Sequence, residues 1–315
     1  MSDLPKAVHI MEVGPRDGLQ IEAKILTIAE RKELVEALAE AGLTEIEVGS
    51  FVSPKAVPQM ADTAALLGTL QRRPGVAYRA LWLNSRGLNQ AIAAGTVDIE
   101  GWIHLAASEA FVKRNTNRDI EETFAQAADW IDLYKAIGVA PDCVSIMAAF
   151  GCNFEGEVPV KRVVEMVARS RNLLADHGVN LRKLALADTM GWASPRHVTF
   201  LIGTLRSRWP ELELKLHLHD TRGLAMANAL AALQMGLREF DASIAGLGGC
   251  PFAGNKGAAG NICTEDFAFM CLETGIETSV DLDALVSVAR LAERLVGHPS
   301  AGKLIRGGTL SEYRG

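Results

Sequence analysis

The chain has 315 residues, of which 49% are hydrophobic and 22% are charged, and its formal net charge is −6. This balance is typical of a soluble globular protein and argues against a domain that wraps nucleic acid, which would be basic. No apolar run approaches the roughly 20 residues that cross a bilayer, and a strand is predicted so early that we expect no signal or transit peptide. We therefore expect a cytoplasmic protein with no nucleic-acid partner and no membrane partner.

Short β-rich segments alternate with amphipathic helical segments along the whole chain, a pattern that predicts parallel strands joined by crossover helices. In the first helical segment Thr27 and Glu30 have capping-box spacing, and Gly42 is expected to end the helix. Eight strands are predicted, at residues 8–13, 45–51, 76–83, 97–106, 143–150, 183–188, 213–219 and 238–245. Eight such units predict a closed (β/α)8 barrel, or TIM barrel. A doubly wound open sheet is the alternative, but no GxGxxG follows the first strand and no Walker motif occurs.

The C-terminal part of the chain continues beyond the eighth unit. Residues 281–296 are predicted to form one more helix, and the tail at 306–315 is too polar to belong to the core. No linker and no internal repeat divides the sequence. We therefore expect one (β/α)8 domain over residues 1–315, of which 281–315 form a helical extension and tail.

Charged side chains follow several of the predicted strands. Arg16 and Asp17 come after the first strand, Glu47 lies in the second, and Asp188 ends the sixth. In a (β/α)8 barrel, catalytic groups lie at the carboxyl ends of the strands and in the loops that follow them. A single aspartate at a strand end is more often a helix cap, but the placement of all four side chains at one rim favours an active site.

The segment HLHD at residues 217–220 gives the sharpest local signal. Residues two apart in a strand project from the same face, so His217 and His219 can both bind one metal ion. Asp17 is the best third ligand, because in a closed barrel only one strand lies between the strand before Asp17 and the strand of the two histidines. Two buried histidines bonded to the backbone are the alternative. Lys215 shares their parity and should point inward near the barrel floor, whereas Asp220 has the opposite parity and is expected to cap the next helix.

The other charged residues have expected roles around this metal site. The guanidinium of Arg16 can turn over the pocket toward an oxygen that gains charge, although a surface ion pair is its alternative. Glu47 and Asp188 could hold metal-bound waters or orient the histidines, and the alternatives are a solvent-facing Glu47 and a helix-capping Asp188. A His/carboxylate/amide shell suits Mg²⁺, Mn²⁺ or Zn²⁺, and residue type does not choose among them.

A glycine-rich segment, AGLGGCPFAGNKGAAGN at residues 245–261, contains Cys250. It permits two interpretations: a surface connection with an incidental cysteine, or a lid that delivers a thiol to a bound molecule. The chain has five cysteines and no CxxC pair, so neither a disulfide framework nor a structural zinc site is indicated. The five are Cys143, Cys152, Cys250, Cys263 and Cys271.

Taken together, the segments VGPRDGLQ, IEVGSFVSPKAVPQM, HLHDTRGLAMANALAALQMG and AGLGGCPFAG…GAAGNICTED resemble the 3-hydroxy-3-methylglutaryl-CoA lyase family of metal-dependent TIM-barrel lyases. The resemblance extends from about Val8 to His298. It implies that Arg16 binds substrate, that Cys250 is the catalytic acid, and that Glu47 and Asp188 belong to the metal neighbourhood. The metal ligands that it implies are Asp17, His217, His219 and Asn261.

The chemistry implied by this resemblance is a retro-Claisen cleavage of an acyl-CoA thioester to acetyl-CoA and a keto acid, acetoacetate. The metal would chelate the hydroxyl and carboxylate of the substrate, Arg16 would offset charge on the thioester oxygen, and Cys250 would protonate the enolate carbon. His217 and Asp17 are the two candidates for the base. The family also implies a homodimer or higher homo-oligomer and a place in leucine degradation and ketone-body metabolism.

Three departures from the family pattern suggest a different acyl group. Cys250 and Asn261 are eleven positions apart, against nine in the usual loop; AAFGCNFEG at 148–156 replaces the usual run; and Ala185 replaces a serine. The same chemistry on citramalyl-CoA or a longer 3-hydroxy-3-alkylglutaryl-CoA is therefore an alternative. More distant alternatives are an acetyl-CoA/2-oxo acid condensing synthase, a biotin-dependent carboxyltransferase and a metal-dependent binding protein.

Overall fold

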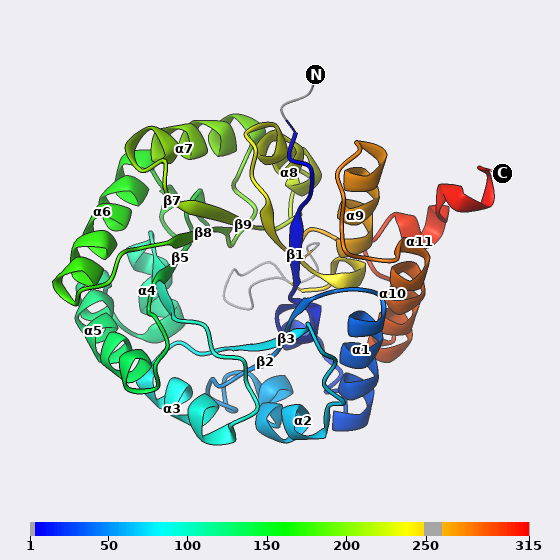
Figure 1. Cartoon of the computed structure of the whole chain (residues 1–315), viewed down its shortest axis with the longest axis horizontal. Helices are drawn as coiled ribbons and strands as arrows, with labels where there is room; N and C mark the ends of the chain where they lie inside the picture. Colours follow the sequence, from blue (N-terminus) through cyan, green and yellow to red (C-terminus); the bar gives the residue numbers. More distant parts are fainter. Residues whose placement is uncertain (1–3, 249–259, 315) are drawn as a thin grey trace.

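The main sheet is a curled layer of eight parallel strands in the order β3-β2-β1-β10-β9-β8-β5-β4. The computed structural model describes residues 4–248 and 260–314. Figure 1 shows the sheet curled around the centre with helices outside it. The strands are β1 (His9–Glu12), β2 (Glu45–Ser50), β3 (Ala77–Leu81), β4 (Trp102–Ala106), β5 (Cys143–Met147), β8 (Lys183–Asp188), β9 (Glu213–Leu218) and β10 (Glu239–Ala242). All eight predicted strands and their order around the (β/α)8 barrel are confirmed.

The helices connect successive strands and cover the outside of the sheet. The first begins at a capping box, as predicted: the Thr27 hydroxyl accepts from the Glu30 N–H, and the Glu30 carboxylate accepts from the Thr27 N–H. The helices are α1 (Ile28–Glu40), α2 (Thr63–Thr69), α3 (Ser85–Ala94), α4 (Glu109–Thr116), α5 (Ile120–Ala136), α6 (Val160–Asp176), α7 (Pro195–Arg208), α8 (Ala225–Gln234), α9 (Thr264–Glu273), α10 (Leu282–Val296) and α11 (Leu304–Gly307). In the part of the chain that the structure describes, none of them is both long and apolar enough to span a membrane.

The seam of the barrel lies between β3 and β4 and is closed by residues that precede β4. The N–H of Asp98 donates to the Tyr78 carbonyl at 3.0 Å, and the N–H of Tyr78 donates to the Asp98 carboxylate at 2.7 Å. The strand predicted at 97–106 therefore begins only at Trp102. Just before β4, Gly101 packs so closely on Ala140 that a Cβ would lie 2.1 Å from the Ala140 oxygen, so no larger residue fits there.

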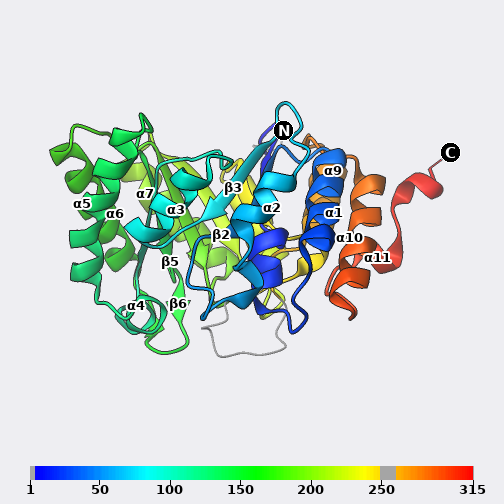
Figure 2. The same cartoon turned by 90° about the horizontal axis from the view of Figure 1, so that it is seen from below.

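Two short strands that the sequence did not predict follow β5. They are β6 (Gly151–Cys152) and β7 (Gly156–Glu157), and they form an antiparallel pair. In Figure 2 this hairpin and α4 lie at the same lower edge of the molecule. Both segments follow carboxyl ends of sheet strands, so this edge is the one where a (β/α)8 barrel carries its active site.

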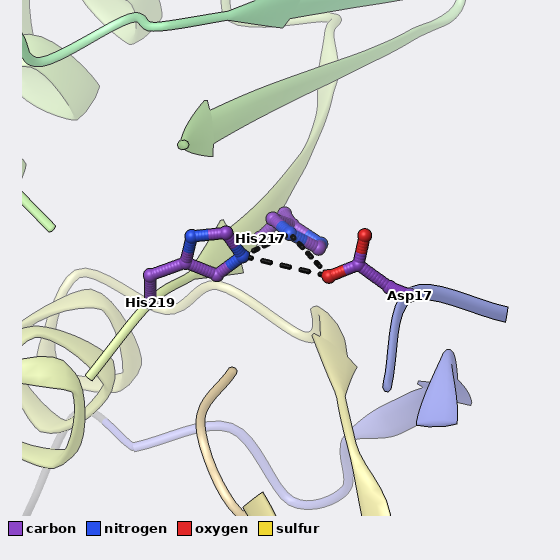
Figure 3. Close-up of side chains that lie close together, drawn as sticks. All are labelled: Asp17, His217 and His219. Atoms are coloured by element: carbon purple, nitrogen blue, oxygen red, sulfur yellow. Dashed lines mark hydrogen bonds and ion pairs between the residues drawn. The ribbon is translucent and has the colours of Figure 1, made fainter. Parts of the chain in front are cut away.

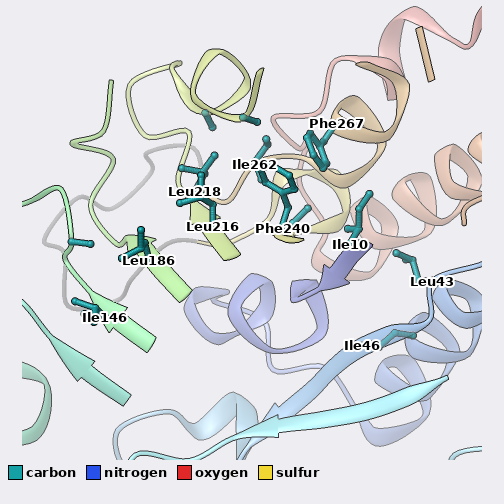
Figure 4. Packing of buried hydrophobic residues seen from close by; sticks show 14 of the residues in the cluster. Ile10, Leu43, Ile46, Ile146, Leu186, Leu216, Leu218, Phe240, Ile262 and Phe267 are labelled. Carbon is teal, nitrogen blue, oxygen red and sulfur yellow. The ribbon is translucent and has the colours of Figure 1, made fainter. Parts of the chain in front are cut away.

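The apolar core fills the layer between the sheet and the helices. Ile10, Ile46 and Leu216 point outward from their strands to meet it, as Figure 4 shows. The rings of Phe240 and Phe267 pack with their centroids 4.9 Å apart. Each fully buried side chain of this size contributes about 1.5–3 kcal/mol to folding, so this layer fixes the strand ends that carry the polar residues.

The predicted C-terminal helix is confirmed as α10, with Asp281 as its cap. It packs beside α1 and α9, and α11 adds the buried side chains of Leu304 and Ile305. The polar tail is tied to the surface, since Arg314 forms an ion pair with Glu273 at 2.7 Å.

Candidate active site

Arg16 and Asp17 lie in a short π-helix, Gly14–Gly18, directly after β1. The backbone N–H groups of Arg16, Asp17 and Gly18 all point to the Val13 carbonyl, at 3.1, 2.7 and 3.3 Å. A Cβ at Gly14 would lie 2.5 Å from the Glu12 Oε1, so a larger residue would not fit here. This tight turn carries both side chains inward over the end of the barrel.

His217 and His219 lie near Asp17, as their parity predicted. In Figure 3 the two imidazoles and the carboxylate converge on one point. The two Nε2 atoms are 3.1 Å apart, and the Asp17 Oδ2 is 3.6 Å from that of His219 and 4.0 Å from that of His217. The strand of Asp17 is separated from β9 only by β10, as expected.

The hydrogen bonds at the Nδ1 atoms of the two rings determine whether the converging Nε2 atoms carry a proton. The Nδ1 of His219 faces the Thr189 carbonyl at 2.7 Å, and the Nδ1 of His217 faces the Asp241 carboxylate at 3.1 Å. Because these oxygens only accept, Nδ1 carries the proton in both neutral rings. Both Nε2 lone pairs then face a carboxylate oxygen of Asp17, an arrangement that a cation stabilises.

Asn261 completes this group from the chain that returns beside β9. It pairs with His219 in an isolated antiparallel bridge, and its Nδ2 donates to the Asp17 Oδ2 at 2.7 Å. Its Oδ1 is buried and has no hydrogen-bond partner among the described residues. A rotation of the amide by 180° would bring this oxygen to the converging atoms, so the four residues fit an N/O ligand set for a divalent ion.

Arg16 is held between two carboxylates. Its Nε donates to the Glu47 Oε2, its Nη1 to the Asp17 Oδ1, and Gln20 also donates to the Asp17 Oδ1, at 2.6 Å. Burial alone would raise the pKa of Asp17, but Arg16 and the two histidines hold it well below its usual range. The structure thus places Glu47 against Arg16, where it orients the guanidinium rather than the histidines.

Asp188 lies at the end of β8, where its Oδ1 accepts from the N–H groups of Trp192 and Ala193 at 2.7 and 3.1 Å. This contact builds the turn before α7, but the cap of that helix is Ser194, so Asp188 is not the helix cap. Its Oδ2 is buried and unpartnered within the described residues, and burial raises the pKa of the carboxyl to about 6. One oxygen therefore builds the turn while the other remains available.

Two residues near the histidines were interpreted incompletely from the sequence. Lys215 does point inward as expected, but it pairs with Asp241 at 2.6 Å. Asp241, which the sequence reasoning missed, also orients His217. The signal was present, because Asp241 lies in the predicted strand 238–245, next to the strand of the two histidines.

Two further predictions have different outcomes. Asp220 caps the next helix as expected, since its Oδ1 accepts from the N–H of Ala225, the first residue of α8, at 2.9 Å. Cys250 lies outside the described residues, so its role stays a prediction. Gly248 and Gly260, the described residues on either side of Cys250, lie in contact, because a Cβ at Gly260 would lie 2.1 Å from the Gly248 oxygen.

A cavity of about 470 Å³ opens beside the converging side chains. It extends from the inward residues of the strands to the end of α4 and the loop that follows, where Arg114 and Arg118 line its outer part. Apolar side chains such as Trp82 and Phe111 form much of the wall. A cavity with a few converging polar groups is the usual form of a small-molecule site.

A cluster that could hold a metal ion, beside a largely buried arginine at the carboxyl end of a (β/α)8 barrel, is typical of a metal-dependent barrel enzyme. The chain belongs to the HMGL-like family, whose model matches residues 7–292. It is 40% identical over 306 residues to human mitochondrial hydroxymethylglutaryl-CoA lyase, covering 96% of this chain and 90% of that one. It is 38% identical over 304 residues to a cytoplasmic 3-hydroxy-3-methylglutaryl-CoA lyase of rat, covering 96% and 85%.

Solved structures agree with this assignment. The HMG-CoA lyase of Bacillus subtilis superposes with a TM-score of 0.88 at 35% identity, covering 96% of this chain and 98% of that one. An HMG-CoA lyase of Acinetobacter baumannii, in complex with coenzyme A and 3-methylmalate, gives 0.88 at 35% identity and covers 99% and 98%. The carboxyl transferase domain of Rhizobium etli pyruvate carboxylase, at 16% identity and a TM-score of 0.68, shares the fold alone. The resemblance to lyases of this family is confirmed.

Proposed function

We propose that the protein is a divalent-metal-dependent carbon–carbon lyase that cleaves 3-hydroxy-3-methylglutaryl-CoA to acetyl-CoA and acetoacetate. The observation that carries the proposal is the convergence of Asp17, His217 and His219 beside Arg16, in a chain 40% identical to a lyase of that name. The relative with bound coenzyme A supports an acyl-CoA thioester as substrate.

The four ligands proposed from the sequence fit a divalent ion, Mg²⁺ or Mn²⁺ in the cell, with Zn²⁺ as a substitute. Such an ion, held by Asp17, His217, His219 and Asn261, would supply Lewis-acid polarisation of the substrate oxygens. Arg16 supports this chemistry as a fixed and largely buried cation. It would stabilise the charge that develops on the thioester oxygen, because Glu47 and Asp17 fix its orientation before substrate binds.

The two candidates for the base differ in their surroundings. Arg16 lowers the pKa of Asp17, which makes that carboxylate a weak proton acceptor. Burial would lower the pKa of His217, but the Asp241 carboxylate raises it. His217 could receive the hydroxyl proton only at Nε2, the atom that would bind the metal, so these pKa directions do not choose between the two candidates.

Cys250 is proposed as the acid that protonates the enolate carbon, on the basis of the family resemblance. A thiol with an ordinary pKa near 8.5 keeps its proton at neutral pH and can still deliver it to a carbanion. A positioned general acid of this kind contributes about 10² to 10⁴ in rate.

The outer part of the cavity suits the phosphates of coenzyme A. Arg114 and Arg118 line it, and neither has an acidic partner in the segments 4–248 and 260–314. The guanidinium of Arg114 lies 4.2 Å from the centre of the Phe154 ring, a cation–π contact that favours one position of its charge. We expect both arginines to bind phosphate groups.

The remaining assignments follow the family and are proposals. They are a single lyase domain over residues 1–315, with 281–315 as its C-terminal extension, a homodimer or higher homo-oligomer, and a place in leucine degradation and ketone-body metabolism. We also propose a cytoplasmic protein, since the curated relatives include cytoplasmic as well as mitochondrial forms.

A coupled assay for released acetyl-CoA tests the proposed function. The parent protein should release acetyl-CoA from 3-hydroxy-3-methylglutaryl-CoA, and Cys250→Ala should reduce turnover by about 10² or more. Equal turnover by parent and variant would refute the role of Cys250. Consumption of acetyl-CoA together with a 2-oxo acid, without any cleavage, would show a condensing synthase instead.

A further inference from the structure

The inner wall of the cavity contains a row of residues one layer below the histidines. His104, Ser145, Ala185 and Lys215 are Cα partners in register across β4, β5, β8 and β9. His217 lies two residues further along β9 than Lys215. Since a strand rises about 3.3 Å per residue, the row lies about 7 Å below His217 along the strand. All four residues line the cavity that also contains Asp17 and His219.

Small side chains keep the space open at this level. Barrels of this fold usually fill their interior with bulky branched residues. Here β8 presents Ala185 and Ala187 inward, and β5 presents Ser145. The cavity therefore continues past the converging ligands into the barrel rather than ending beside them.

Two polar side chains face this space without a partner. Neither the ring nitrogens of His104 nor the hydroxyl of Ser145 makes a hydrogen bond within the described part of the chain, and both residues line the cavity. The ring of His104 is fixed, because it stacks on Trp102 at 6.4 Å and meets the edge of Trp130 at 6.2 Å between ring centres. Burial and the nearby Arg16 lower the pKa of His104 to about 4, so it is a neutral donor and acceptor.

The cations near this row are already paired. Lys215 lies 2.6 Å from the Asp241 carboxylate, and Arg79 binds Glu45 at 2.7 Å. The row therefore offers hydrogen bonds without uncompensated positive charge. Such surroundings favour an uncharged oxygen over a carboxylate, which would have to give up its hydration without gaining a counter-ion.

We propose that His104 and Ser145 form a specificity subsite for the 3-substituent of the acyl group, and that this substituent is longer than methyl and bears an uncharged hydroxyl. A branch of two to four atoms would reach from the reacting carbon near His217 to this row. The inference rests on the proposed lyase function and names the substrate class within it.

Three thioesters test the subsite: the 3-methyl, the 3-propyl and the 3-(2-hydroxyethyl) forms of 3-hydroxyglutaryl-CoA. For the parent, kcat/KM on the hydroxyethyl form should exceed that on the propyl form by roughly tenfold or more, because a site built to bind a hydroxyl rejects the analogue that lacks it. His104→Phe and Ser145→Ala should each reduce this ratio several-fold. Ala185→Leu should lower kcat/KM for both long forms more than for the methyl form.

His197→Phe is the matched control, since His197 lies on α7 against Phe150 and does not line the cavity. It should leave all three rates unchanged, and thermal unfolding should show that each variant is folded. An equal loss on all three substrates in His104→Phe would overturn the subsite, as would a parent that cleaves only the methyl form. A parent that cleaves none of the three would instead refute the proposed function.

Discussion

The two ends of the barrel interior both hold charged side chains but pair them differently. At the amino end acids and bases alternate: Glu45 contacts both His9 and Arg79, and Glu239 contacts both His9 and Lys183. At the carboxyl end three acceptor atoms converge on one point, and buried oxygens of Asp188 and Asn261 lack partners among the described residues.

This difference distinguishes charged groups that stabilise the fold from charged groups that are available to a ligand. A buried charge is tolerated when a partner and hydrogen bonds compensate it, as at the amino end. Acceptor atoms that converge on one point are costly unless a ligand supplies the missing positive charge. The carboxyl end therefore has an unfavourable arrangement that a bound cation would relieve, whereas the charges at the amino end compensate one another.

Removal of the ion should give the largest effect. Chelation by EDTA, or Asp17→Ala, should lower kcat/KM for acetyl-CoA release by about 10³-fold, since a metal ion contributes several kcal/mol of charge stabilisation. Added Mg²⁺ or Mn²⁺ should restore the chelated protein. Asp220→Ala is the control, because this aspartate also follows a strand but caps α8. Full activity after chelation would show that the converging group has a structural role only.

The pH dependence of stability that arises from Glu12 gives a second test of the difference between the two ends. It is fully buried at the carboxyl end and accepts from the N–H groups of Gly14 and Ile244 and from Thr264, with no cation beside it in the described chain. Burial raises its pKa from 4.5 to about 8. The folded protein then holds a proton that the unfolded chain loses, so this contribution to stability is complete below pH 4.5 and is lost as pH rises through 8.

Glu12→Gln tests this pH dependence, because the amide mimics the protonated acid. Between pH 5 and pH 8 the free energy of unfolding of the parent should fall by a few kcal/mol relative to the variant. Urea denaturation at several pH values gives this difference. Parallel curves for the two proteins would show that Glu12 is ionised in the fold.

Asp241→Asn should have a moderate effect at the carboxyl end. The amide no longer holds the Nδ1 proton of His217 as strongly, so the affinity for Mn²⁺ should fall about 10- to 100-fold. Titration calorimetry with Mn²⁺ alone measures this change. An unchanged Kd would show that Asp241 pairs with Lys215 but does not orient His217 for metal binding.

Arg182→Ala should have the smallest effect. This arginine pairs with Asp142 at 2.8 Å and with Glu213 at 2.9 Å at the amino end, and its side chain is 41% exposed. Exposed pairs contribute about 0.2–1 kcal/mol, so urea denaturation should detect a loss of about 1 kcal/mol or less, with kcat/KM unchanged. A tenfold loss of activity would contradict the separation of the two ends.

The sequence predicted the features that depend on local periodicity. The alternation of strands and helices was sufficient for the eight strands, and the parity of His217 and His219 was sufficient to place them together. The seam at Asp98 and the pairing of Asp241 depend on contacts between distant segments. Parity shows that a side chain points inward but not which inward side chain it meets, so Asp241 and His104 were missed.

The contact between the two ends of the glycine-rich segment affects how such enzymes can diverge. Gly248 and Gly260 meet, and Asn261 is bonded to the strand of the histidines and to Asp17, so both ends are fixed by contacts outside the segment. Closing a loop of eleven residues instead of nine costs only about 0.2 kcal/mol more in chain entropy. The number of residues between the two glycines can therefore change over evolution almost freely, while the amide that we assign to the metal stays in place.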